Sequence, residues 1–233
     1  MSEEEINRKI TIIFATDVVG YSKHMEADES ETVKNLRACE KLLTGLFKKH
    51  KGRLFNTGGD SFLAEFSSAV SAVECAVEFQ KAIKERNSTE EATVNLKFRI
   101  GINSGDVVKE KDNLLGDGVN IAARLEALAQ SGGITISKSV YDYVKGKTKF
   151  EFNDLGLQKV KLNEFHAFDL LLSPDQKRKI TKKSNGYIGY IIVALALLLV
   201  GTGLFIYETQ KVSEQILQQS SKLFGLFLSF RNN

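Results

Sequence analysis

Hydrophobic residues in the first 170 positions form continuous apolar runs that alternate with stretches of helical spacing. Residues 10–15 are almost wholly apolar, which predicts a central strand buried on both faces. Residues 94–102 alternate apolar and polar positions and predict another strand. After it we expect a turn at 103–106 and, beyond a short extended stretch, a charged loop at 109–113. Further strands are predicted at 134–136 and within 150–172.

Helical spacing predicts four helices between these strands, each preceded by a residue whose side chain can cap it. The expected limits are Ser30 to Lys49, Ser67-Ser68 to Ile83 or beyond, Asp117 to Ala129, and Ser137 to Val144. Residues 53–66 predict a hairpin, because two strand-like runs flank the turn sequence Gly58-Gly59-Asp60. Interleaved helices, strands and a hairpin favour an α+β fold, with a mixed or antiparallel sheet and helices packed on it.

The composition changes after Pro174. Residues 187–207 contain no charged side chain, and at ~1.5 Å per residue such a helix crosses a hydrocarbon core of ~30 Å. Basic residues gather at 177–183, on the N-terminal side of this stretch, so the positive-inside rule places the large domain in the cytoplasm. We therefore expect a single-pass protein of the cell inner membrane.

Four parts follow from these patterns: a domain at 1–173, a basic linker at 174–186, a membrane span at 187–207 and a short extracytoplasmic tail at 208–233. The tail contains several apolar residues beyond position 212. It fits an amphipathic helix on the far membrane face or a contact between chains, and the sequence leaves both open.

Charge and cysteine content narrow the classes of function that the chain can have. The net charge is +3 and the basic excess is confined to the linker, so nucleic-acid binding is not expected. Cys39 and Cys75 lie in helix-like segments and are expected to be buried free thiols. The N-terminal sequence Ser2-Glu3-Glu4-Glu5 is acidic and lacks the features of a signal peptide.

Three segments carry candidate chemistry. The apolar run 10–15 is followed by Thr16 and Asp17 and then by the turn sequence 18–22, an arrangement that can present a carboxylate to a metal and backbone N–H groups to phosphate. A second carboxylate, Asp60, lies in the hairpin turn. The third segment runs from Gly116 to Glu126. Each alone would be a weak signal.

Together, in this order and spacing, the three segments resemble the class III nucleotidyl cyclases, the adenylate and guanylate cyclase catalytic domains, over roughly residues 10–172. The resemblance implies that a nucleoside triphosphate is cyclised, with attack of the ribose 3′-oxygen on the α-phosphorus and loss of pyrophosphate. It implies a ferredoxin-like core and a homodimer with active sites at the interface.

The resemblance also assigns roles to individual residues. Asp17, Asp60 and the Val18 carbonyl are expected to hold two divalent ions, Mg²⁺ or Mn²⁺. Asn120 and Arg124, four residues apart on one helix face, are expected to orient the ribose and stabilise the transition state. Residues expected to bind the phosphates are Val19, Gly20, Tyr21 and Lys161.

The base-reading positions depart from the adenylate cyclase pattern. Where those enzymes have a lysine and an Asp or Thr, this chain has Asn56 and Asn113, and a one-residue slip would put Asp112 in the second place. In this respect the chain resembles the bacterial pyrimidine cyclases of anti-phage systems, which favours UTP or CTP. An adenylate cyclase and a catalytically inactive nucleotide-binding or dimerisation module remain alternatives. A diguanylate cyclase would need an acidic residue at Ser61.

Overall fold

The computed structural model describes residues 7–90, 92–160, 163–178 and 187–231. The chain forms two compact units, residues 1–180 and residues 181–233. The first unit holds an eight-stranded sheet and its helices, and the second holds one long helix. The expected α+β class is confirmed.

The sheet of the first unit has the strand order β2-β3-β1-β4-β6-β8-β7, with the short β5 paired to β4. Neighbouring strands are antiparallel except for β4 and β6. The strands span β1 Arg8–Val18, β2 Gly52–Gly58, β3 Ser61–Phe66, β4 Phe98–Glu110, β5 Asn113–Leu115, β6 Ile134–Ser137, β7 Glu151–Val160 and β8 Asn163–Leu171. The central position expected for residues 10–15 is confirmed, since β1 lies between β3 and β4.

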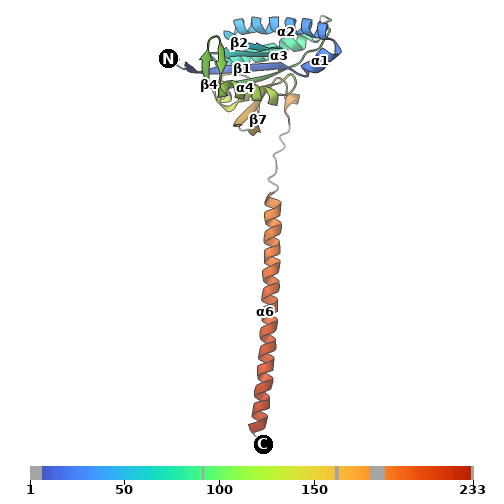
Figure 1. The fold of residues 1–233 in the computed structure, drawn as a ribbon, viewed down its shortest axis with the longest axis vertical. Helices are drawn as coiled ribbons and strands as arrows, with labels where there is room; N and C mark the ends of the chain where they lie inside the picture. Colours follow the sequence, from blue (N-terminus) through green and yellow to red (C-terminus); the bar gives the residue numbers. More distant parts are fainter. Residues whose placement is uncertain (1–6, 91, 161–162, 179–186, 232–233) are drawn as a thin grey trace, which may run out of the picture. The chain divides into compact units, whose positions relative to one another are not determined.

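Helices cover both faces of the sheet, as Figure 1 shows for α2 and α3 on one side and α4 on the other. On the first face, α2 (Glu29–Lys49), α3 (Ala69–Arg86) and α5 (Lys138–Val144) enclose the main core with residues such as Phe14 and Phe47. On the second face, α4 (Asp117–Leu128) buries Ala122 against Ile13 and Ala15 of β1. β1 is therefore buried on both faces at Ile12–Thr16, whereas Ile10, which was expected to be buried, is 77% exposed.

One strand differs from the expectation at both ends: β4 begins at Phe98, whereas the predicted strand began at residue 94. The turn predicted at 103–106 does not exist, because β4 continues through it to Glu110. β1 pairs with β4 over eleven residues, from Arg8 opposite Val108 to Val18 opposite Phe98, and this ladder keeps Asn103–Asp106 extended. The charged loop expected at 109–113 is reduced to the two residues between β4 and β5.

Helix starts also differ in detail. Asp28, rather than Ser30, caps α2 by accepting a hydrogen bond from the Glu31 amide at 3.0 Å. Before it, the turn expected after Asp17 includes a short helix, α1 (Tyr21–Ala27), that begins after Gly20 in a left-handed conformation. Asp117 lies in the first turn of α4 and Gly116 occupies the capping position. The caps expected at Ser68 and Ser137 are confirmed, as are the buried free cysteines.

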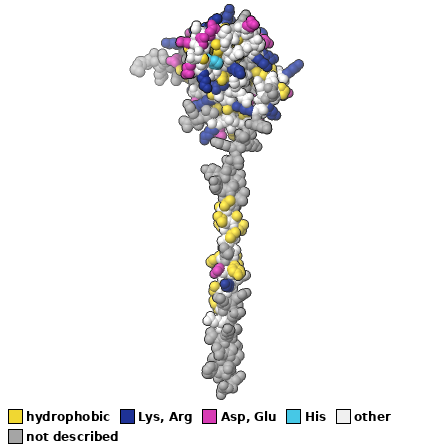
Figure 2. Space-filling view, turned by 90° about the vertical axis from the view of Figure 1, so that its right-hand side faces the viewer, with side chains coloured by type: hydrophobic (Ala, Val, Ile, Leu, Met, Phe, Trp, Pro, Cys, Tyr) yellow, Lys and Arg dark blue, Asp and Glu magenta, His cyan; other side chains and the backbone are white. Residues whose placement is uncertain are grey.

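After β8 the chain forms a short 3₁₀ helix, η1 (Pro174–Gln176). The second unit contains α6 (Tyr187–Arg231), a single helix of 45 residues. Within its described residues, the 21-residue stretch Val193–Ser213 is long and apolar enough to cross a membrane. Figure 2 shows hydrophobic side chains along this stretch. The helix does not break at position 207, where a separate tail was expected.

Candidate active site at the end of β1

Two carboxylates meet where β1 approaches its C-terminal end. Asp17 is the penultimate residue of β1, and Asp60 lies in the two-residue turn between β2 and β3. Because β3 pairs with β1 from Ile12 to Thr16, this turn is brought beside Asp17. Burial raises the pKa of the Asp60 carboxyl group, and the negative charge of Asp17 raises it further, while the Val18 backbone lowers it by hydrogen bonding. The expectation from the sequence that Asp17 and Asp60 lie close together is confirmed.

Arg99 of β4 lies opposite Asp17 in the strand register. Its guanidinium donates to both carboxylate oxygens of Asp17, from Nη2 to Oδ2 at 2.7 Å and from Nε to Oδ1 at 3.1 Å. These bonds to Asp17 raise the pKa of Arg99. Arg99 is thus a positively charged residue at the site, and the sequence reading did not single it out.

Glu126 of α4 adds a third carboxyl group. Its Oε1 lies 3.0 Å from Arg99 Nε, but the N–H of that nitrogen donates to Asp17, so Oε1 is buried without a hydrogen bond from any described residue. Burial and, after it, contact with Asp17 together raise the pKa of Glu126 to about 8. Three carboxyl groups share one guanidinium here, which leaves a site with excess acceptor capacity and negative charge.

This donor set fits a divalent cation. Hard oxygen ligands suit Mg²⁺ and Mn²⁺, which take one or two carboxylates from the protein and complete their shell with phosphates and water. Among the described residues, no group of three or more His, Cys, Asp and Glu is arranged as a ready metal cage. The protein would therefore supply only part of the metal's coordination shell, and the substrate's phosphates would supply the rest.

α4 lies unusually close to β4. A Cβ atom on Gly101 would lie 2.2 Å from both the Ala122 carbonyl oxygen and the Glu126 nitrogen, so only glycine permits this approach. At the start of the helix, the buried Asn103 side chain donates to the Gly118 carbonyl at 3.0 Å. Gly101 and Asn103 of β4 therefore set the position of α4.

The two expected catalytic residues of α4 have different surroundings. Asn120 is exposed. Arg124 is half-buried, and its Nη1 is buried without a hydrogen-bond partner among the described residues. The exposed Asn120 amide is accessible to a ligand or to a second chain, and the buried Arg124 nitrogen has hydrogen-bonding capacity that the described residues leave unused.

The residues expected to bind phosphate differ in their surroundings. The Val19 amide donates to the Lys97 carbonyl at 2.8 Å, because the chain still follows β4 at this point, so it is not free for phosphate. Gly20 adopts φ 68°, which turns the chain into α1 with Tyr21 as its first residue. Lys161 lies outside the described residues.

Asn56 and Asn113, the expected base-reading pair, are in contact. Asn56 Nδ2 donates to Asn113 Oδ1 at 3.2 Å, and the Leu114 amide donates to the same oxygen at 2.9 Å. Both asparagines line a hollow of about 700 Å³ between β2 and the β4–β5 turn. With Asn113 Oδ1 engaged twice, Asn113 has only its Nδ2 donors left, whereas Asn56 offers Oδ1 as an acceptor and its second Nδ2–H as a donor.

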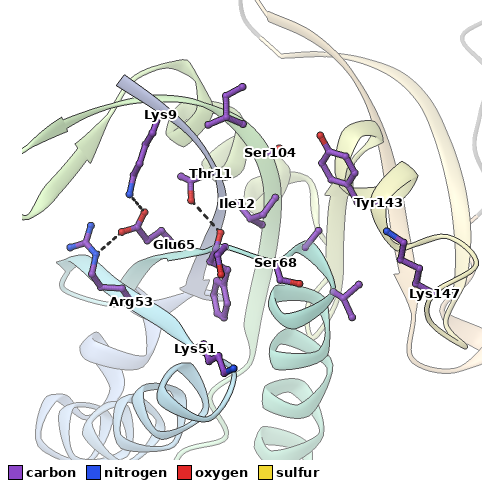
Figure 3. Close-up of a pocket in the computed structure, with 15 residues that line it drawn as sticks. Lys9, Thr11, Ile12, Lys51, Arg53, Glu65, Ser68, Ser104, Tyr143 and Lys147 are labelled. Carbon is purple, nitrogen blue, oxygen red and sulfur yellow. Dashed lines mark hydrogen bonds and ion pairs between the residues drawn. The ribbon is translucent and has the colours of Figure 1, made fainter. Parts of the chain in front are cut away.

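A separate cavity of about 740 Å³ lies near the other end of β1 (Figure 3). Lys9 and Arg53 both point to Glu65 there, so the carboxylate is neutralised within the cavity wall. Thr11 of this wall is six residues from Asp17, roughly 20 Å along a strand. The cavity is therefore distinct from the candidate active site.

Comparison with known proteins decides the family. The model of the adenylate and guanylate cyclase catalytic domain matches residues 2–182. The chain belongs to this family. A protein of Rhizobium meliloti named "Putative adenylate cyclase 3" is 44% identical over 162 residues, which are 69% of this chain and 28% of that protein. The chain thus matches only about a quarter of that relative's length.

Solved structures agree with the family. An adenylate/guanylate cyclase/hydrolase from Silicibacter pomeroyi shares 35% identity with a TM-score of 0.65, covering 72% of this chain and 99% of the other. The adenylyl cyclase CyaB from P. aeruginosa, at 22% identity and a TM-score of 0.65, covers 75% of this chain and 100% of its own, and supports the fold alone. The expected enzyme class, a nucleotidyl cyclase, is confirmed at the level of family.

Within this cyclase domain, the sequence reading missed Arg99 and Glu126. Arg99 is one of the polar positions in an alternating strand, and Glu126 is the last residue of the third candidate segment, with no role assigned to it from the sequence. The signal that would have found Arg99 is its register opposite Asp17, which requires the pairing of two strands more than 80 residues apart.

Proposed function

We propose that this cyclase domain converts a nucleoside triphosphate into a 3′,5′-cyclic nucleotide and pyrophosphate. The observation that carries the proposal is the convergence of Asp17, Asp60 and Arg99 at one end of β1, in a chain of the cyclase family. The reaction joins the ribose 3′-oxygen to the α-phosphorus and breaks the bond to the β-phosphate oxygen. Such a phosphoryl transfer depends mainly on positioning and charge stabilisation.

Asp17 and Asp60, with the Val18 carbonyl, would hold two divalent ions, Mg²⁺ or Mn²⁺. When bound, such ions neutralise the phosphates and make the 3′-hydroxyl more acidic. Arg99, which binds Asp17 through both carboxylate oxygens in the structure, can exchange one of these bonds for a phosphate oxygen. The protein would thereby keep positive charge at the triphosphate.

Asn120 and Arg124 would act on the substrate bound by a second copy of the chain. The exposure of Asn120 supports this role, as does the half-buried Arg124, whose guanidinium keeps a nitrogen without a partner among the described residues. Asn120 would hydrogen-bond the ribose, and Arg124 would stabilise charge on the α-phosphoryl group. The homodimer would then contain two composite sites.

The base is proposed to be a pyrimidine, and the asparagine pair favours uracil. In the adenylate cyclase pattern, position 56 donates to the ring nitrogen and position 113 accepts from the amino group. Here Asn113 can only donate, because its oxygen is engaged, and Asn56 provides an acceptor beside its remaining N–H, which allows the reverse order. Uracil fits the reversed order, because its N3–H donates to Asn56 and its O4 accepts from Asn113. Cytosine and adenine have an acceptor at the ring nitrogen and a donor at the amino group, which is the opposite pattern.

The name of the Rhizobium relative favours ATP as the second candidate substrate. Guanine shares with uracil the order of a ring N–H and a keto oxygen, so GTP belongs in the same comparison. An inactive module that only binds nucleotide is the candidate of another class, and the presence of Asp17, Asp60, Asn120 and Arg124 together argues against it.

The proposed setting is a membrane. α6 contains a candidate span, the basic residues before it favour a cytoplasmic catalytic domain, and the inner membrane is the site inferred from them. A cyclic pyrimidine nucleotide would serve there as a second messenger, and the resemblance to bacterial pyrimidine cyclases suggests defence against phage as its role.

The deciding experiment is side-by-side turnover of ATP, GTP, UTP and CTP by the full chain with Mn²⁺. We expect UTP to be cyclised at least about tenfold faster than ATP or CTP, because a mismatched base leaves polar groups unpaired. The double variant Asn56→Lys, Asn113→Asp should shift preference toward ATP. Strong preference of the unmodified chain for ATP would reject the uracil assignment, and no turnover of any nucleotide would reject the cyclase function.

A further inference from the structure

Arg178 is the last residue of the described segment 163–178, and its side chain contacts the sheet of the first unit. Its Nε donates to Asp169 Oδ2 at 2.6 Å and its Nη2 donates to Asp169 Oδ1 at 2.8 Å. The Asp169 side chain is only 9% exposed, and it also accepts a hydrogen bond from Thr135 Oγ1 at 2.8 Å. This is a bidentate, largely buried ion pair, unlike a mobile surface contact.

The third contact of Arg178 reaches α4. Arg178 Nη1 donates to the carbonyl oxygen of Leu128, the last residue of that helix, at 3.1 Å. The final carbonyl groups of a helix have no partners within it, and a cation there is favourable. Leu128 lies one turn after Arg124, so this bond fixes the end of α4 next to a proposed catalytic residue.

Other contacts hold α4 at its beginning and middle. Asn103 binds the Gly118 carbonyl near the start, and Gly101 admits the helix backbone at Ala122 and Glu126. Arg178 is the residue that adds a side-chain hydrogen bond at the last turn. It belongs to the segment that continues to α6, which begins nine residues later at Tyr187.

We infer that Arg178 is a positioning residue, which holds the C-terminal turn of α4 on β8 and thereby sets the placement of Asn120 and Arg124. The effect on turnover rests on the proposed function, but the effect on α4 does not. The segment leading to α6 is therefore tied directly to the helix that carries the catalytic pair.

The test uses the full chain in detergent and compares Arg178→Ala with Lys177→Ala, the exposed neighbouring cation. Two properties are measured: amide hydrogen exchange across the chain, and kcat and KM for the best nucleotide. In Arg178→Ala we expect exchange in the last turn of α4 to rise about tenfold, with kcat falling about tenfold and KM little changed. Lys177→Ala should match the unmodified chain in both.

Arg178→Lys provides a second variant if the alanine variant fails to fold. Lysine keeps the charge but cannot hold both Asp169 oxygens and the Leu128 carbonyl with one planar group, so we expect an intermediate rise in exchange and fall in kcat. Unchanged exchange in α4, or unchanged kcat in folded protein that has only lost thermal stability, overturns the inference. If the unmodified chain turns over no nucleotide, the proposed function fails, and exchange alone decides whether Arg178 holds α4.

Discussion

Arg99 and Asp17 are joined by two hydrogen bonds, one to each carboxylate oxygen, across the central pair of strands. The pairing of β1 with β4 places these two residues opposite each other. Without a metal ion, the guanidinium neutralises the carboxylate that the proposed chemistry needs. Each carboxylate oxygen has a second lone pair, so a metal ion bound at Asp17 would share this carboxylate with Arg99.

The first prediction concerns the metal carboxylates. Asp17→Ala and Asp60→Ala should each lower Mn²⁺-dependent turnover by about a thousandfold, because bound metal supplies several kcal/mol of charge stabilisation. Each variant should also weaken Mn²⁺ binding measured calorimetrically with a non-reactive nucleotide. Asp106→Ala is the control, since Asp106 is ion-paired with Arg8 near the opposite end of the β1–β4 ladder and should leave both measurements unchanged. Wild-type turnover in either active-site variant would reject the two-metal assignment.

The second prediction tests the composite site. Asp17→Ala chains mixed with Arg124→Ala chains should recover activity, because each mixed dimer contains one site with neither defect. Asp17→Ala mixed with Asp60→Ala should not recover, since both carboxylates belong to the same half of the site. Turnover is measured after exchange of subunits has been verified by tagged pull-down. Equal recovery in both mixtures, or in neither, would argue against a site shared in this way.

The third prediction concerns the close approach of α4 to β4. Gly101→Ala places a methyl group 2.2 Å from backbone atoms of α4, so the helix must shift. We expect a loss of about 1–3 kcal/mol in the free energy of unfolding and a lower kcat. Gly45→Ala is the matched control, because Gly45 lies in α2 with open space around it and should stabilise the protein by roughly 0.5–1 kcal/mol. Thermal unfolding and turnover of both variants check the prediction.

The fourth prediction concerns the membrane. Deleting Tyr187–Asn233 removes the candidate span and should move the protein from the membrane pellet to the supernatant after ultracentrifugation. The remaining chain, 1–186, retains Arg178 and its bonds to Asp169 and Leu128. The full chain is the reference, and it should stay in the membrane pellet after a wash with high salt. A shortened chain that still sediments with membranes would show that another surface binds lipid.

The sequence by itself determined the elements whose signals are local. The apolar run before Asp17 predicted a buried central strand, and Gly58-Gly59-Asp60 between two strand runs predicted the hairpin turn. The spacing of Asn120 and Arg124 on one predicted helix, and the uncharged stretch after residue 186, likewise needed no knowledge of distant residues. In each case a short-range pattern of polarity, backbone freedom or helical period carries the information.

The tertiary structure decided what depends on pairing between distant segments. Asn103–Asp106 has the composition of a turn, yet the ladder with β1 holds it extended and lets Asn103 reach α4. The same ladder sets Arg99 on Asp17, and the docking of the chain after β8 sets Arg178 on Asp169 and Leu128. The role of an arginine depends on the carboxylate that folding places beside it. Because charge complementarity acts through space, it leaves no periodic pattern along the sequence.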